Sequence, residues 1–238
     1  MSFYMRYNGI ILPIKVKEVG GRGPLSQNVI RSKTPNRPGT TYKKKEYPER
    51  PLPVSFYLLE TTSLEELREQ VDSLSAMLDV EGPKPTVFSD EPSKVYYSIL
   101  DGEPDWEEIK HYGKGVLPML RLDPLKYGQE KTVTSTTIIN EGTASCTPIF
   151  NVEFTSAANE FRVQNEDGKF VRVIWAFVAG DKLVVDFKKR KITINYTVRM
   201  TSLDFSSNWF ELRPGENKLT VTPSSVATTT ITYTPRWL

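Results

Sequence analysis

The stretch that most restricts how this chain can fold is residues 116–128, which read Val-Leu-Pro-Met-Leu-Arg-Leu-Asp-Pro-Leu-Lys-Tyr-Gly. Leu120 and Leu122 flank Arg121, and this period-two alternation is typical of a half-buried strand. Asp123-Pro124 predicts the end of the strand, because proline has no amide proton and pushes the preceding residue into an extended or turn conformation. We therefore expect a strand that stops at a border within the chain.

The composition changes across this border. Before it the chain is rich in proline and charge, and after it short segments rich in Thr, Val and Ile alternate with turns. A chain of 238 residues with 38% hydrophobic and 11% aromatic residues can form two packed cores of common domain size. The sequence therefore predicts a mainly β protein with two domains, residues 1–128 and residues 129–238.

Net charge and cysteine content give no argument for a nucleic-acid or membrane partner, and they favour a reducing compartment. Lys and Arg number 31 against 29 Asp and Glu, a balance that gives no argument for nucleic acid or membrane. The single cysteine, Cys146, cannot form an internal disulfide, and the N-terminus lacks the pattern of a secretory signal. The longest apolar run, residues 173–179, is far shorter than the roughly 20 residues that span a bilayer. We expect a soluble protein assembled in a reducing cytoplasm.

Residues 63–78 predict the one clear helix. Ser63 and Glu66 have the spacing of a capping box, in which hydroxyl and carboxylate accept hydrogen bonds from free amides of the first turn. The apolar residues recur at three- and four-residue steps: Leu64, Leu67, Val71, Leu74 and Leu78. This single stripe predicts packing against a sheet.

Residues 31–50 are basic and interrupted by prolines. Their charged residues are Arg31, Lys33, Arg37, Lys43, Lys44, Lys45 and Arg50, against Glu46 and Glu49. Tyr42 and Tyr47 lie among the lysines, so a patch that stacks nucleic-acid bases is one interpretation. Because no nucleic-acid-binding module is recognisable, we favour an extended hairpin or arm that stays solvated or docks on an acidic neighbour.

Residues 101–113 contain the strongest candidate for chemistry. They hold Trp106, the only histidine, His111, and the carboxylates Asp101, Glu103, Asp105, Glu107 and Glu108. On a helix, Glu107 and His111 would share a face as metal ligands. A site with one histidine and no cysteine would have to bind a hard cation through oxygen atoms, and no calcium-loop spacing is present.

The same carboxylates also suggest a glycosidase. Asp101, Asp105 and Glu108 are candidates for its paired acids. Such a pair needs environments that separate the two pKa values, whereas an acidic loop interrupted by proline looks uniformly solvated. We therefore predict no catalytic residues, no metal and no cofactor.

The second domain reads as about nine short strands of an antiparallel β-sandwich of the jelly-roll kind. The expected strands include residues 133–139, 149–154, 161–163, 171–178, 183–187, 192–195, 219–221 and 228–233. Asp167-Gly168 predicts a hairpin turn, and residues 188–191 a charged one. Trp175 lies in an apolar run and is expected in the core, whereas Trp209 and Trp237 are candidates for a surface that binds sugar or a partner.

Several motifs in order resemble the distal tail protein (Dit) family of long-tailed bacteriophages, also called the siphophage tail component family. They are Arg37-Pro-Gly39, the capped helix, residues 120–128, Asn-Glu-Gly-Thr at 140–143 with Pro-Ile-Phe at 148–150, Ala-Gly-Asp-Lys-Leu-Val-Val-Asp at 179–186, and Trp-Phe-Glu-Leu-Arg-Pro-Gly-Glu-Asn at 209–217. In one departure, the family often has Pro-Gly-x-Asp-Gly in the arm, whereas Pro38-Gly39 is followed here by Thr40-Thr41-Tyr42.

The resemblance implies a structural protein of the siphovirus tail tip or baseplate, part of the virion and assembled in the host bacterial cytoplasm. It implies a hexameric ring formed by a first domain akin to tail-tube proteins, with a galectin-like second domain projecting outward. The implied partners are the tail tube protein, the tape measure protein, the tail-associated lysin or hub, and receptor-binding or fibre proteins. The genome would pass through the lumen without specific nucleic-acid binding, and no membrane is involved.

A ring of identical subunits closes through contacts between two different patches. The candidate patches are the basic arm, with Arg37, Tyr42, Lys43, Lys44 and Lys45, and the acidic segment, with Asp105, Glu107 and Glu108. The alternative function is a carbohydrate-binding adhesion module that contacts the host cell surface.

Overall fold

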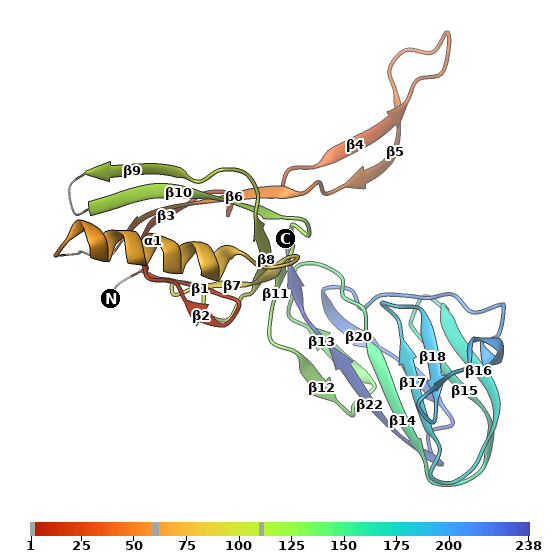
Figure 1. Ribbon diagram of the computed structural model, residues 1–238. Helices are drawn as coiled ribbons and strands as arrows, with labels where there is room; N and C mark the ends of the chain where they lie inside the picture. Colours follow the sequence, from red (N-terminus) through yellow and green to blue (C-terminus); the bar gives the residue numbers. More distant parts are fainter. Residues whose placement is uncertain (1–2, 59–61, 110–111) are drawn as a thin grey trace. The chain divides into compact units, whose positions relative to one another are not determined.

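The structure, a computed structural model, describes residues 3–58, 62–109 and 112–238, with the backbone alone at residues 108, 109 and 112. Two compact units divide the chain, Met1–Lys126 with Leu238, and Tyr127–Trp237. Apart from one α-helix and a short 3-10 helix, the described elements are strands (Figure 1). The predicted fold class, mainly β, is confirmed.

The first unit is built on one antiparallel sheet with the strand order β2-β1-β7-β8-β10-β6-β3, and β9 also pairs with β10. Its strands are β1 (Met5–Tyr7), β2 (Ile10–Ile11), β3 (Ile14–Val19), β6 (Arg50–Leu58), β7 (Lys84–Phe88), β8 (Tyr96–Leu100), β9 (Asp105–Ile109) and β10 (Tyr112–Arg121). Asn8 and Gly9 both have positive φ, 49° and 82°, which makes the two-residue turn between β1 and β2 possible.

The predicted helix is confirmed as α1 (Leu64–Leu78) with Ser63 as its N-cap. The Ser63 hydroxyl accepts the backbone N–H of Glu66 at 3.1 Å, as the capping box requires. The Glu66 carboxylate accepts the backbone N–H and the hydroxyl of Thr62, at 2.8 and 2.9 Å, one residue before the amide that a capping box would use. Side chains therefore accept hydrogen bonds from two free backbone amides at the start of the helix.

The core of the first unit lies between α1 and one face of the sheet. Alternate residues of β6 are buried, Leu52, Val54, Phe56 and Leu58, and belong to one cluster with Leu67, Leu74 and Leu78 of α1. The intervening residues Ser55 and Tyr57 lie on the opposite, polar face of the sheet. The amphipathic pattern of the helix thus has the partner that the sequence predicts.

In β10 the burial phase is opposite to the one predicted from residues 120–122. Leu117, Met119 and Arg121 are buried, whereas Leu122 is 53% exposed. The side chain of Arg121 is 1% exposed, so a charged residue occupies a core position between two leucines. The predicted end is confirmed, since the strand stops at Arg121, before Asp123-Pro124.

The segment predicted as an acidic loop contains the strand β9, which is a correction. Trp106 drives this arrangement, because its ring stacks on Phe56 with centroids 6.1 Å apart and joins the edge of the core. β10 presents glycine at Gly113 and Gly115, and a Cβ at either position would overlap the Trp106 ring or the Asp105 carbonyl oxygen. The two glycines therefore allow β9 to lie close against β10.

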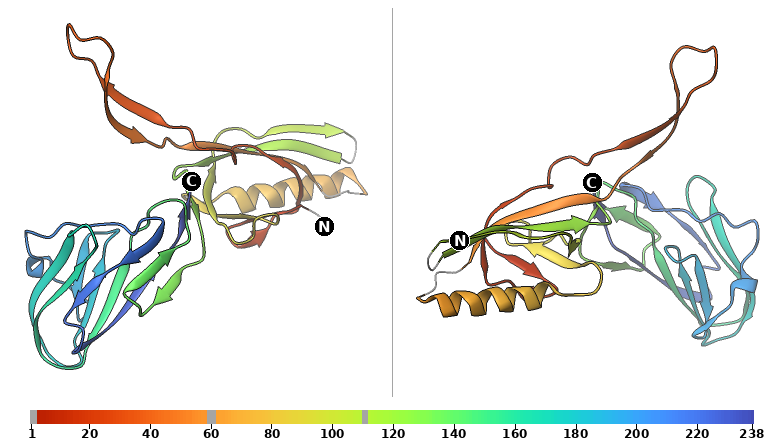
Figure 2. Two further views of the ribbon diagram at one scale, coloured as in Figure 1. Left: turned by 180° about the vertical axis from the view of Figure 1, so that it is seen from behind. Right: turned by 45° about the horizontal axis from the view of Figure 1, so that its top comes forward.

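Two further strands of the first unit stand apart from its sheet. β4 (Asn28–Ser32) and β5 (Thr41–Glu46) pair antiparallel with each other, with a bulge between Ile30 and Arg31. They form the predicted arm, a hairpin that extends away from the sheet and from α1 (Figure 2).

The second unit is a β-sandwich, as predicted. A six-stranded sheet, β12-β22-β14-β17-β18-β19, faces the smaller sheets β16-β15-β21 and β13-β20. The strands are β11 (Lys126–Tyr127) at the division between the units, β12 (Lys131–Val133), β13 (Thr137–Asn140), β14 (Ile149–Phe154), β15 (Ala158–Gln164), β16 (Phe170–Phe177), β17 (Lys182–Asp186), β18 (Lys191–Ile194), β19 (Thr197–Val198), β20 (Gly215–Lys218), β21 (Thr220–Thr222), β22 (Ala227–Tyr233) and β23 (Arg236–Trp237). The 3-10 helix η1 (Met200–Ser202) follows β19.

Inward-facing residues of both sheets form the second core. Phe154 of β14 and Phe177 of β16 stack with centroids 3.9 Å apart, which joins the two sheets directly. Trp175 is half-buried against this core, as the sequence suggests. The strand predicted at residues 133–139 is divided into β12 and β13, which belong to different sheets.

We predict that Gly115→Ala lowers the free energy of unfolding by about 1–3 kcal/mol, because the new methyl group would force β9 away from β10. Urea denaturation measures the loss. Gly23→Ala is the matched control: its nearest atom is 3.9 Å away, so a change within about 0.5 kcal/mol is expected. Equal losses in both variants would show that the β9–β10 approach is not restrictive.

Candidate functional site

The arm is largely exposed, and only Ile30 and Ser32 of β4 are half-buried. Every residue of β5 is exposed, and Tyr42 is 62% exposed. At the tip, Asn36 and Gly39 have positive φ, 59° and 82°, and the N–H of Arg37 donates to the Thr34 carbonyl at 3.3 Å. This hydrogen bond closes a turn over Pro35-Asn36, and the chain bends again at the predicted Pro38-Gly39, so Arg37 lies in the exposed connection between β4 and β5.

The cations of the arm fall into two groups. Lys44 forms an ion pair with Glu46 at 2.5 Å, and Lys45 lies over the Tyr47 ring at 5.0 Å. In the described part of the chain, the other four cations have no ion pair: Arg31, Lys33, Arg37 and Lys43. The arm thus carries a positive charge that the first unit does not neutralise.

The base of the arm is anchored by a cluster around Glu91. Its carboxylate accepts hydrogen bonds from the Tyr96 hydroxyl at 2.6 Å and from Arg22 and Lys126 at 3.2 Å. Burial alone would raise the pKa of Glu91, but these donors outweigh burial and lower the pKa below its ordinary value. Arg22 also pairs with Asp90 at 2.7 Å, so the loop between β3 and β4 is held on the β7–β8 turn.

Arg121 completes the anchor from inside the core. Its guanidinium donates to the Gly21 carbonyl at 3.0 Å and lies 5.2 Å from the centroid of the Tyr96 ring. Burial lowers the pKa of Arg121 to about 10, so the group is still charged at neutral pH. Gly21 has φ 69°, and a Cβ there would overlap the carbonyl oxygen of Pro51, which explains why glycine is required at this contact.

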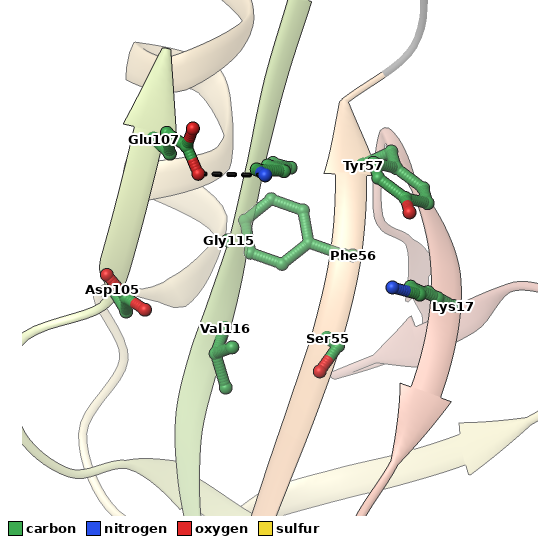
Figure 3. A pocket seen from close by; sticks show the side chains of 9 residues that line it. Lys17, Ser55, Phe56, Tyr57, Asp105, Glu107, Gly115 and Val116 are labelled. Carbon is green, nitrogen blue, oxygen red and sulfur yellow. Dashed lines mark ion pairs between the residues drawn. The ribbon is translucent and has the colours of Figure 1, made fainter.

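The predicted acidic partner surface lies on the polar face of the first sheet. Asp105 and Glu107 of β9 line an open pocket of about 260 Å³ together with Lys17 and Tyr57 (Figure 3). Glu107 is already paired with Lys114 at 2.8 Å, the interaction drawn as a dashed line. The side chain of Glu108 is outside the described residues. This surface is therefore of mixed charge rather than acidic.

The local structure differs from the helix on which the metal hypothesis depends. Glu107 lies on a strand, so it cannot share a helical face with His111, which is outside the described residues. Within residues 3–58, 62–109 and 112–238, no three His, Cys, Asp or Glu side chains are grouped to hold a metal ion. No helix in that described part is long and apolar enough to cross a membrane.

The two tryptophans predicted for a sugar or partner surface are half-buried. Trp209 packs edge-on against Phe187 with centroids 5.0 Å apart, at the margin of the second core. Trp237 is half-buried, and Gly128 leaves room for its ring, because a Cβ there would approach it to 2.5 Å. Both rings are therefore partly covered by their own domain, and their role as a sugar or partner surface stays a prediction.

Besides Phe205, the second unit has a second strongly exposed aromatic that sequence reasoning missed, Tyr196. It is 87% exposed in the turn between β18 and β19, where Asn195 and Tyr196 both have positive φ. Its only sequence signal is the Asn-Tyr pair between two short Thr-containing strands. Tyr196 borders a pocket of about 310 Å³ on the outer face of the six-stranded sheet, with Asn151, Glu153 and Lys182.

Two family descriptions match the chain, "Phage tail protein RIFT-related domain" over residues 10–120 and "Siphovirus-type tail component, C-terminal domain" over residues 141–237. The chain is 32% identical to the distal tail protein of Bacillus phage SPP1, over 99% of this chain and 96% of that protein. The crystal structure of SPP1 Dit, described as a paradigm of the hub adsorption apparatus in phages that infect Gram-positive bacteria, superposes with a TM-score of 0.88 and 28% identity over 100% of both chains. A chain of the phage p2 baseplate, at 7% identity with a TM-score of 0.52 and 97% coverage of both, shares the fold alone.

We predict that Glu91→Gln lowers the free energy of unfolding by about 1–2 kcal/mol at neutral pH, because the three donors lose a charged acceptor. Since the folded-state pKa is lowered, this contribution is present above the unfolded carboxylate pKa of about 4.3 and is lost as the pH falls through the folded value. The difference between wild type and variant should therefore shrink from about pH 5 to about pH 3, as measured by urea denaturation.

The matched control is Glu103→Gln, which removes an exposed carboxylate of the same unit. We expect it to change stability by less than about 0.5 kcal/mol at either pH. A pH dependence identical in wild type and Glu91→Gln would contradict the assignment.

Proposed function

Because this chain belongs to the distal tail protein family of siphophages, we propose that it forms a hexameric ring at the tip of the phage tail. The family membership makes it a structural component of the tail and baseplate hub, and thus part of the virion. In the proposal, one face of the ring binds the tail tube protein and the other binds the tail-associated lysin or hub. The tape measure protein and the genome pass through the lumen, and the ring assembles in the host cytoplasm.

The two domains have separate roles in this proposal. Residues 1–128 form the ring, because they carry the arm and its anchored base. Residues 129–238, the galectin-like sandwich, project outward and hold receptor-binding or fibre proteins. The proposal includes no catalysis, since the relatives are structural tail proteins and Glu107, considered as a metal ligand, lies on a strand and is paired with Lys114.

The observation that carries the proposal is the charged, exposed arm. A closed ring of identical subunits needs two different complementary patches on each copy. The arm supplies one patch: Arg37 and Lys43 have no ion pair in the described part of the chain, and Tyr42 is exposed. Arg22 and Arg121 fix its base. The carboxylates Asp105, Glu107 and Glu108 are the acidic partner proposed from the sequence.

A second candidate function is carbohydrate binding by the second domain. The observation in its favour is the pocket beside Tyr196, which combines an exposed aromatic ring with the amide of Asn151 and the charges of Glu153 and Lys182. An aromatic face and a few convergent polar groups are the usual elements of a small-ligand site.

We predict that reversing Lys43, Lys44 and Lys45 to glutamate weakens the ring more at about 50 mM salt than at about 500 mM salt, because salt screens exposed charges. Native mass spectrometry of the full-length protein measures the hexamer fraction. Reversing Lys188, Lys189 and Arg190 in the turn after β17 changes the same number of charges and should leave the hexamer intact. A wild-type protein that stays monomeric at every concentration would contradict the ring itself.

For the adhesin candidate, the prediction concerns Tyr196→Ala. Calorimetric titration of the full-length protein with galactose- and N-acetylglucosamine-terminated oligosaccharides should show binding that falls at least about tenfold in Tyr196→Ala, the equivalent of about 1.4 kcal/mol. Trp209→Phe keeps the packing against Phe187 and should bind as wild type does. Absence of binding by the wild type at millimolar sugar would remove the adhesin candidate and leave the ring.

A further inference from the structure

The exposed face of α1 carries a row of carboxylates. Glu65, Glu69, Asp72 and Asp79 are all exposed, and their spacing of four, seven and fourteen residues from the first places them on one side of the helix. With a rise of about 1.5 Å per residue, this row, the acidic stripe, is about 21 Å long.

The carboxylates of the acidic stripe differ from Glu107 of β9 in their ion pairing. In the part of the chain that the structure describes, no ion pair reaches any of its four carboxylates, whereas Glu107 is paired with Lys114. Arg68 lies beside the stripe and has an interaction of its own. The stripe is therefore the more strongly acidic of the two surfaces that the first unit offers.

Helix stability does not explain the whole stripe. Acidic residues in the first turn, such as Glu65, interact favourably with the positive end of the helix dipole. Asp79 is the C-cap, and the last turn contains no basic residue, so its carboxylate lies at the end where the dipole disfavours negative charge. A requirement outside the helix would explain an acid at this position.

The arm has the complementary properties. Four of its cations have no ion pair among the described residues, and they are distributed over β4, the connection and β5: Arg31, Lys33, Arg37 and Lys43. Within one copy the arm extends away from α1 (Figure 2), and no ion pair joins the two among the described residues. The arm of one molecule therefore leaves its own stripe unneutralised.

We propose that the acidic stripe of α1 receives the basic arm of a second copy of this chain. The contact is heterologous, since arm and helix are different patches, and each copy uses both, as a closed ring requires. This inference rests on the proposed ring and replaces Asp105–Glu108 with α1 as the acidic side of the contact.

Two charge-reversed proteins test the contact. The arm-reversed protein carries Arg31→Glu, Lys33→Glu and Lys43→Glu, and the stripe-reversed protein carries Glu69→Lys, Asp72→Lys and Asp79→Lys. Glu65 is left in place because it supports the start of the helix. Circular dichroism and thermal unfolding establish that both proteins are folded.

For each reversed protein alone, native mass spectrometry at about 50 mM salt should show a hexamer fraction at least tenfold lower than that of the wild type. An equimolar mixture should recover hexamers that contain three copies of each protein, because the acidic arm of one then meets the basic stripe of the other in both directions. A single chain that carries all six reversals should also assemble, since its acidic arm meets the basic stripe of the next copy.

The matched control is Asp105→Lys with Glu107→Lys, which reverses the sequence-predicted surface and should leave the hexamer intact. Normal hexamers from the stripe-reversed protein, or no recovery in the mixture, would overturn the α1 contact while the ring stands, and the arm would then bind a different tail protein. If the stripe-reversed protein is unfolded, a neutralised protein with Glu69→Gln, Asp72→Asn and Asp79→Asn is used in its place. An unchanged hexamer fraction in that protein would also overturn the α1 contact. A monomeric wild type would instead overturn the ring.

Discussion

The buried guanidinium of Arg121 links the base of the arm to the end of β10 in the first unit. The Arg121 side chain lies in the core against the Tyr96 ring and donates a hydrogen bond to the Gly21 carbonyl. Burying a cation is unfavourable unless its surroundings compensate, so the residues around it have little freedom to change. Glu91 supplies negative charge on the other side of Tyr96 and binds Arg22 and Lys126. The base of the arm is thus fixed to the end of β10.

The sequence was sufficient where a local rule dominates. The capped, amphipathic pattern of residues 63–78 predicts α1. The basic segment at residues 31–50, interrupted by prolines, predicts the arm. It misled where tertiary contacts override the local pattern. Alternation predicts Leu122 inside and Arg121 outside, but the cation–ring contact reverses this phase. An acidic composition predicts a loop at residues 101–108, but Trp106 and the glycines of β10 form a strand.

The candidate site was less predictable than the fold, because exposure depends on neighbours that are distant in the chain. Trp209 has a surface-like context in the sequence, yet Phe187 covers it. Tyr196 is exposed because it lies in the tight turn between β18 and β19. The acidic stripe is visible in the sequence, but a polar helix face is normally read as solvated. What distinguishes it is that no ion pair neutralises it among the described residues, in a chain whose arm has the opposite charge.

The hairpin of β4 and β5 also bears on what happens to the protein before it meets its partners. Each of these strands has one edge whose backbone amides and carbonyls are not paired by a strand of its own chain among the described residues, and such edges readily join other strands into aggregates. Lysine side chains on an edge strand are a common protection against that outcome. The run Lys43–Lys45 places three such lysines on β5, so the charge that suits the arm for an acidic partner also opposes edge-to-edge aggregation of free subunits.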